Sequence, residues 1–144
     1  MAESRNSGAV RCVVVTPEST SLDTHARLVT VPLDDGLRGV GRGHSPFIGR
    51  LGAGVVRIVG EQGAGSAESV RRLYVDGGFV EVAHDVVTVI TQRAIPSEVL
   101  DPASARAELE RIKSGRASGD EAIAAKQRAE ASARALARAA AQPR

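Results

Sequence analysis

The sequence predicts a mainly β protein with α: an N-terminal β-sandwich of about nine or ten short strands, followed by a C-terminal antiparallel two-helix hairpin. The evidence is a shift in composition, because all eighteen valines lie before residue 100 and fifteen alanines lie from Ala103 onward. Valine fits pleated sheets, whereas alanine is the best helix former. We therefore expect a sandwich domain over residues 1–95 and a helical hairpin over residues 96–144.

Short β-rich runs separated by turn residues support the sandwich. Runs predicted as strands are residues 10–16, 19–22, 28–31, 55–59, 73–75, 79–83 and 86–91. Three turns are expected, at Asp34-Asp35-Gly36, at Asp76-Gly77-Gly78 and at His84-Asp85, since Gly and Asp residues supply the backbone angles of tight turns. Residues 60–69 read as a polar hairpin tip, and the first eight residues as a frayed start. Consecutive apolar residues in Val86–Ile90 predict burial on both faces, by a second sheet and by the helices or a partner.

Two proline dipeptides, Ile95-Pro96 and Asp101-Pro102, separate the predicted sandwich from the helices, and the first helix signal lies at the second dipeptide. Asp101 followed by Pro102 predicts an N-cap and a first helical residue, with a helix to about residue 113. A break at residues 114–119 precedes a second helix that extends towards Ala141. This helix holds only Ile123 and Leu136 as large apolar residues, so it has high helix propensity but little apolar surface to anchor it. We therefore expect that it can detach, although close packing through alanine fits the same residues.

The stretch from Gly39 to Ile58 is rich in glycine and is interpreted as a docking loop that feeds a strand. His44 in this loop is either a general base or, more simply, a side chain whose hydrogen bonds hold the loop in shape. No nucleophile or second acid stands beside it in the sequence, which favours the second interpretation. Asp34 and Asp35 are likewise better explained as turn formers than as a carboxylate pair.

No catalytic or metal site is predicted, and no cofactor is expected. The three histidines lack the spacing of metal ligands, and Cys12 is a lone cysteine among apolar residues, expected to be an inert core thiol. Residues 1–105 hold ten basic and twelve acidic side chains, whereas residues 106–144 hold nine and five, so the helical part is basic and could meet an acidic partner. With two Phe and one Tyr the chain has no stacking platform for nucleic acid. No apolar run reaches membrane-spanning length, so membrane association is expected only through a partner.

Several motifs of the predicted sandwich resemble one family. They are Val13-Val14-Val15-Thr16-Pro17-Glu18, Gly-His-Ser-Pro-Phe-Ile at 43–48, Gly54-Val55-Val56-Arg57-Ile58, Tyr74-Val75-Asp76-Gly77-Gly78-Phe79-Val80-Glu81-Val82 and residues 86–95. Together they resemble the epsilon subunit of F-type ATP synthases, of the bacterial type, which is called delta in mitochondria. The resemblance covers about residues 10–101, and over the helices it rests on composition and order.

The resemblance implies a non-catalytic subunit of the central stalk, which couples ion-driven rotation of the c-ring to ATP synthesis. Its implied partners are the gamma subunit, the c-ring, and the catalytic beta and alpha subunits through the C-terminal helices, which can also inhibit ATP hydrolysis. The implied location is the cytoplasmic face of the bacterial plasma membrane, as a peripheral protein. The alternative from the residues alone is a free-standing ligand- or peptide-binding sandwich with a dimerising helical arm, and a small hydrolase using His44 is a third reading that lacks a nucleophile.

Carried onto this chain, the resemblance also implies contact residues. Those for the c-ring or gamma are Leu37, Arg38, Val40, Arg42, Gly43, His44, Ser45 and Pro46, and those for the beta subunit are Lys126, Arg128, Arg134 and Arg138. Leu37, Arg38 and Arg42 depart from the family pattern, which has an acidic residue, a leucine and a proline there. Ser104 stands where members that bind ATP have an arginine, so no nucleotide site is assigned and weak or no ATP binding is expected.

Overall fold

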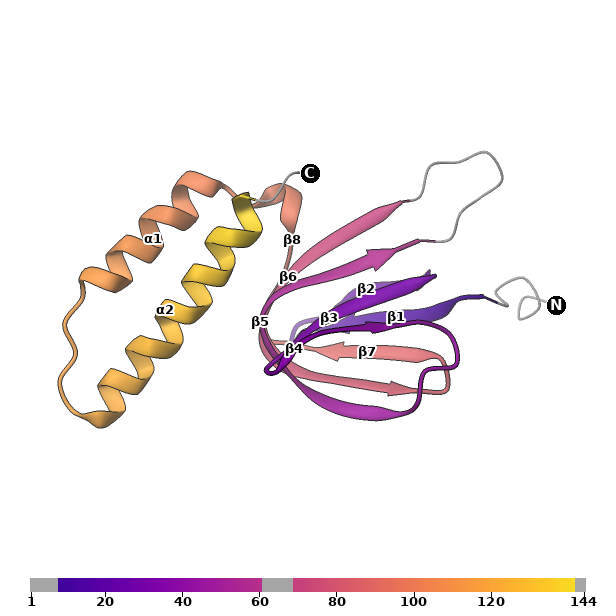
Figure 1. Ribbon diagram of the computed structural model, residues 1–144. Coiled ribbons are helices and arrows are strands. Elements are labelled where there is room, and N and C mark those ends of the chain that lie inside the picture. Colours follow the sequence, from indigo (N-terminus) through magenta and orange to yellow (C-terminus); the bar gives the residue numbers. More distant parts are fainter. Residues whose placement is uncertain (1–7, 61–68, 142–144) are drawn as a thin grey trace.

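The computed structural model describes residues 8–60 and 69–141. The expected frayed start and nearly all of the expected hairpin tip at 60–69 lie outside these residues. Figure 1 shows a layered body of strands with a two-helix hairpin against one end, while the start of β1 lies at the opposite end. The predicted fold class, a β-sandwich followed by two helices, is confirmed.

Eight strands belong to the described part of the chain, and they form one continuous sheet. They are β1 (Val10–Val15), β2 (Thr20–Ala26), β3 (Leu28–Leu33), β4 (Gly36–Val40), β5 (Phe47–Val59), β6 (Val70–Ala83), β7 (Val86–Ile90) and β8 (Ala94–Pro96). The order is β2-β1-β7-β6-β5-β3-β4, with β8 also paired to β6. Because the long strands β5 and β6 curve, the sheet folds over into two layers (Figure 1).

The core lies between these two layers and consists mainly of valine. In β1 the residues alternate, so that Val10, Cys12 and Val14 are fully buried while Arg11 is exposed. Val80, Val82, Val87 and Val89 continue the same cluster from β6 and β7. Each buried valine contributes about 1.5 kcal/mol or more relative to an exposed one. The β-branched composition of the first hundred residues therefore supplies both the strands and the core.

The expectation of nine or ten short strands is wrong in detail, since two strands are long. β6 runs without interruption through the predicted turn at Asp76-Gly77-Gly78, and β5 starts at Phe47, well before the predicted start. Gly77 and Gly78 have φ of 77° and 112°, so they bend a strand and do not reverse the chain. A Cβ on Gly78 would lie 2.0 Å from the carbonyl oxygen of Ile90 in β7. This close approach explains why glycine is needed there.

The turn predictions at Asp34-Asp35 and His84-Asp85 are confirmed, because each lies between two strands that pair antiparallel. His84 and Asp85 have φ of 52° and 59°, the left-handed angles that a tight hairpin needs. Within the chain itself Val86–Ile90 is buried on one face, so the helices do not supply the second cover that was predicted, while burial of that face by a partner stays a prediction. The strand alternates instead, with Val87 and Val89 fully buried and Ile90 50% exposed.

Both helices lie where the sequence predicts them. After a short 3-10 helix (Ser97–Val99), α1 spans Pro102–Ser114 and α2 spans Asp120–Ala141. The Asp101 carboxylate accepts a hydrogen bond from the Ala103 amide, which confirms the predicted N-cap. The helix α2 packs on the outer face of β5 and β6 through a small cluster that contains Tyr74, Leu100, Ala135 and Ala139. The only large apolar side chain that α2 brings to this cluster is Leu136, while Ile123 is 43% exposed.

Candidate functional site

The β4–β5 loop, residues 41–46, is a short irregular segment at the end of the sandwich away from the helices. The amide of Gly43 donates a 2.7 Å hydrogen bond to Oδ1 of Asp85, in the turn between β6 and β7. The amide of Arg11, at the start of β1, donates to the carbonyl oxygen of Asp85 at 2.9 Å. Gly43 has φ of 80°, which a glycine adopts without strain. Asp85 thus ties the loop to two neighbouring parts of the sandwich.

His44 takes part in holding this loop. Its Nδ1 lies 2.7 Å from the carbonyl oxygen of Ser45, and its ring is 5.3 Å from that of Phe47. The guanidinium of Arg38 lies 4.8 Å from the Phe47 ring centroid, a cation–π distance. These contacts support the interpretation of His44 as a loop-holding side chain. Within the described residues, no three His, Cys, Asp or Glu side chains form a group that could hold a metal ion.

The residues predicted to contact the c-ring or gamma do not form one patch. Val40 is fully buried in the core, so its side chain does not reach the surface. Leu37 is 74% exposed and lies beside α2, in a groove described below. The rest follow β4 towards the far end, where Arg42, Gly43, Ser45 and Pro46 are exposed and His44 is half-buried. Their partner contacts stay predictions.

The basic residues predicted on the second helix differ in their surroundings. Arg128, Arg134 and Arg138 are exposed and Lys126 is half-buried. Arg134 pairs with Glu130 one turn earlier, at 2.8 Å, whereas Arg138 lies beside the sheet. They therefore do not act as one uniform basic face in this conformation.

A polar network between the sheet and α2 was not predicted. The hydroxyl of Tyr74, a fully buried residue in β6, donates to the carbonyl oxygen of Ser132 at 3.0 Å. The Ser132 hydroxyl in turn donates to Oδ1 of Asp76 at 2.8 Å, and Arg93 reaches Oδ2 of the same carboxylate at 3.4 Å. Burial, together with the nearby Asp76 carboxylate, raises the pKa of Tyr74, which keeps its hydroxyl a donor. We call Tyr74, Asp76, Arg93 and Ser132 the hairpin latch.

A second feature that the sequence did not reveal is an apolar outer face on the layer away from α2. Phe79 in β6 and Ile90 in β7 are directly opposite each other and about half exposed, and Ile48 in β5 is 75% exposed. Arg50 is opposite Phe79 and Glu81 is opposite Ile48, so the exposed apolar side chains of this face are interspersed with charged ones, a composition that suits contact with another protein. The alternation in β5, β6 and β7 could have indicated this face if the strand register had been known.

The start of α1 is held by internal hydrogen bonds around Asp101. Oδ2 of Asp101 accepts from the Ser104 hydroxyl at 2.6 Å, while Oδ1 accepts from the Ala103 amide at 3.2 Å. These bonds lower the pKa of Asp101. Both carboxylate oxygens of Asp101 thus serve the helix cap. Among the described helices, none is long and apolar enough to cross a membrane.

Comparison with known proteins gives consistent results. Residues 9–97 match the family model described as ATP synthase, Delta/Epsilon chain, beta-sandwich domain. The ATP synthase epsilon chain of Rhodopirellula baltica is 52% identical over 93 residues, which are 65% of this chain and 68% of that protein. The epsilon chain of Magnetococcus marinus is 41% identical over 91 residues, 63% of this chain and 62% of that protein. The fold is also similar to a chain in the cryo-EM structure of the Euglena gracilis mitochondrial ATP synthase (OSCP/F1/c-ring), with a TM-score of 0.77 at 20% identity over 91% of this chain and 81% of that chain.

Proposed function

The chain belongs to the delta/epsilon chain family of ATP synthases, and we propose that it is a non-catalytic subunit of the central stalk, coupling ion-driven rotation of the c-ring to ATP synthesis. The observation that carries this proposal is the sandwich itself. The family match covers it, and its surface includes a tied loop and the exposed apolar side chains of Phe79, Ile90 and Ile48, which suit contacts with other subunits. His44, the strongest candidate for a catalytic group, is engaged with Ser45 and Phe47.

We propose contacts at two surfaces of the sandwich, the β4–β5 loop and the outer face around Phe79. The β4–β5 loop, with exposed Arg42 and Ser45, faces the c-ring or the gamma subunit. The apolar outer face around Phe79 contacts a subunit of the stalk. In this arrangement Asp85 is a positioning residue, because it holds the loop through the Gly43 amide. The subunit lies at the cytoplasmic face of the bacterial plasma membrane and is attached through the complex.

The hairpin is proposed to be the regulatory part. When α2 leaves the sheet it extends towards the beta and alpha subunits and carries Lys126, Arg128, Arg134 and Arg138 to acidic parts of these subunits, and ATP hydrolysis is inhibited. The composition of α2 supports this, since alanine supplies most of its buried surface and the latch supplies its polar contacts. The alternative of a free-standing ligand-binding module with a dimerising arm is not favoured by the family match.

Add-back to a depleted complex tests the proposal. Membranes that lack this subunit are expected to hydrolyse ATP without pumping ions, and the full chain is expected to restore ATP-driven pumping. If pumping is the same with and without the chain, the coupling role is wrong. A chain truncated after Asp101 should still restore pumping but give faster ATP hydrolysis than the full chain. Equal hydrolysis rates would refute the inhibitory role alone.

A further inference from the structure

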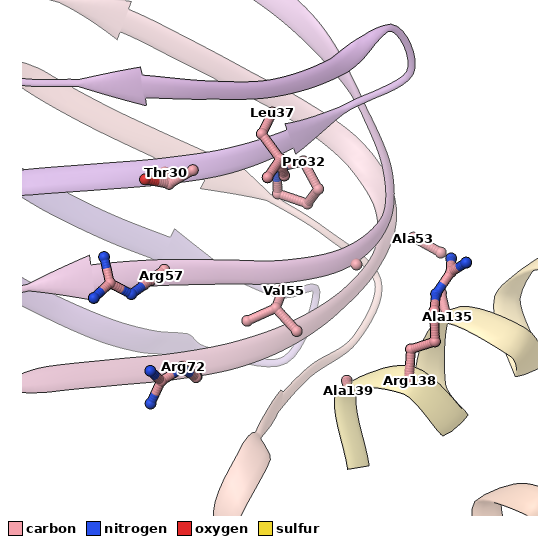
Figure 2. Close-up of a pocket in the computed structure, with 11 residues that line it drawn as sticks. Thr30, Pro32, Leu37, Ala53, Val55, Arg57, Arg72, Ala135, Arg138 and Ala139 are labelled. Atoms are coloured by element: carbon pink, nitrogen blue, oxygen red, sulfur yellow. The ribbon is translucent and has the colours of Figure 1, made fainter. Parts of the chain in front are cut away.

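A groove lies between α2 and the outer face of β3, β5 and β6, with a volume of about 440 Å³. Figure 2 shows Arg57 and Arg72 together at one end and Arg138 at the other, with Pro32 and Val55 between them. Its lining residues are Thr30, Pro32, Leu37, Ala53, Gly54, Val55, Arg57, Arg72, Ala135, Arg138 and Ala139. The groove therefore has an apolar floor and basic ends, and no acidic side chain lines it. We call this the arginine groove.

The arginines of this groove have no counter-charge in the described part of the chain. Arg57 and Arg72 are directly opposite each other in the β5–β6 register, and Thr30 in β3 is opposite Arg57. Like charges at directly opposite positions destabilise a sheet. None of the three groove arginines makes an ion pair with a described residue, whereas Arg134, one turn before Arg138, pairs with Glu130. The isolated chain therefore keeps an unfavourable charge arrangement around an apolar floor.

We propose that the arginine groove binds an acidic segment of a partner protein, with carboxylates on the arginines at both ends and an apolar side chain on the floor. Guanidinium groups bind carboxylates through paired hydrogen bonds, so the chemistry and the sign of the charge both fit. A single small anion at Arg57 and Arg72 would leave the floor and Arg138 uncovered. A segment of polypeptide spans both ends and covers the floor beside Leu37, which is 74% exposed.

This docking has a consequence for the hairpin, because α2 forms one wall of the groove. The groove exists only while α2 lies on the sheet, so a segment bound there stabilises the folded hairpin by mass action. It also engages Arg138, which is then unavailable to other subunits. The inference rests on the proposed function, since it takes the partner from the same complex: the subunit of the stalk on which the sandwich docks.

Adjacent arginines provide a matched pair of variants for the test. Arg71→Glu and Arg72→Glu make the same change of charge at neighbouring positions of β6, but Arg71 is exposed and does not line the groove. Purified full-length chains are titrated calorimetrically with the purified gamma subunit of the same complex. We expect Arg72→Glu to weaken binding roughly tenfold or more and Arg71→Glu to change it little. The Arg72→Glu chain should stay folded, because the new carboxylate lies opposite Arg57.

The outcomes separate the groove from the proposed function. If the unaltered chain binds gamma and Arg72→Glu binds it equally well, the groove is not the docking site although the stalk assignment stands. If the unaltered chain does not bind gamma, the assignment and the groove both fail. Titration with inorganic pyrophosphate tests whether the groove binds a small anion instead. If Arg72→Glu abolishes pyrophosphate binding but leaves gamma binding unchanged, the groove is a small-anion site and the proposal is overturned.

Discussion

The hairpin latch gives the sharpest test of how α2 is held. Ser132→Ala removes the hydroxyl that donates to Asp76 but leaves the helix and the Tyr74 hydrogen bond to the Ser132 carbonyl intact. A hydrogen bond to a charged group contributes about 1.5–3 kcal/mol, and we take the lower value because Asp76 keeps contact with solvent. A loss of about 1.5 kcal/mol raises the detached fraction of the hairpin roughly tenfold.

Two single-copy residues of the chain report on this detachment. Tyr74 is the only tyrosine and is fully buried under α2, so its rate of nitration by tetranitromethane follows the detached population. Cys12 is the only cysteine and lies in the sandwich core, so its alkylation reports opening of the sandwich. Ser132→Ala should speed nitration roughly tenfold and leave alkylation of Cys12 unchanged.

Ser114→Ala is the matched control. Its hydroxyl donates only to the carbonyl oxygen of Arg111 in its own helix, so the substitution makes the same chemical change without touching the sheet. Nitration of this variant should match that of the unaltered chain. The latch is refuted if Ser132→Ala nitrates no faster than Ser114→Ala, or if nitration and Cys12 alkylation rise together, which would indicate loss of the whole fold.

Four further outcomes are expected. Burial raises the pKa of the Cys12 thiol to about 12, so Ellman's reagent at pH 8 should modify it only after unfolding, and rapid reaction in the folded chain would contradict its burial. Asp85→Gly keeps the left-handed backbone but removes the acceptor of the Gly43 amide, so exchange of that amide should quicken, whereas Asp85→Asn should retain protection; equal exchange in both variants would contradict the positioning role. Because the pKa of Tyr74 is raised in the folded chain, the latch should be fully formed below pH 10, the ordinary value of the phenol, and be lost as pH rises through the folded value; a hairpin that stays docked in dichroism and exchange measurements at higher pH would argue against it. Gly78→Ala should lower the free energy of unfolding by more than about 1 kcal/mol in urea titration, and an unchanged midpoint would show that the two strands can move apart.

The sequence predicted those elements whose signals are local. Asp101 with Pro102 predicts the start of α1 because a side-chain cap and a missing amide act within one turn. The turn at His84-Asp85 is also local. The prediction of a turn at Asp76-Gly77-Gly78 was wrong because a glycine with positive φ can either reverse the chain or bend a strand. Only the approach of Gly78 to β7 distinguishes the two, and that contact is tertiary.

The candidate site was less accessible to sequence reasoning, because its surfaces depend on strand register. Arg57 and Arg72 are fifteen residues apart in the chain, and only the β5–β6 pairing places them opposite each other. Ser132 is one small residue on an alanine-rich helix until the fold brings it to Asp76. The predicted contact residues of 37–46 are a continuous stretch, yet an extended strand carries Leu37 and Arg42 to different ends of the sandwich.

The latch and the arginine groove act on the same helix in opposite directions. Two hydrogen bonds from the latch favour the docked hairpin by about 2–3 kcal/mol, in addition to the apolar burial of Leu136, Ala135 and Ala139 against the sheet. Docking also places Arg138 at the end of the groove opposite to Arg57 and Arg72, and the solvent-screened repulsion between these charges opposes docking weakly. An acidic segment in the groove would turn the repulsion into attraction on both walls. The occupant of the groove would then decide whether the hairpin of the assembled protein is docked or released, while the sandwich core stays unchanged.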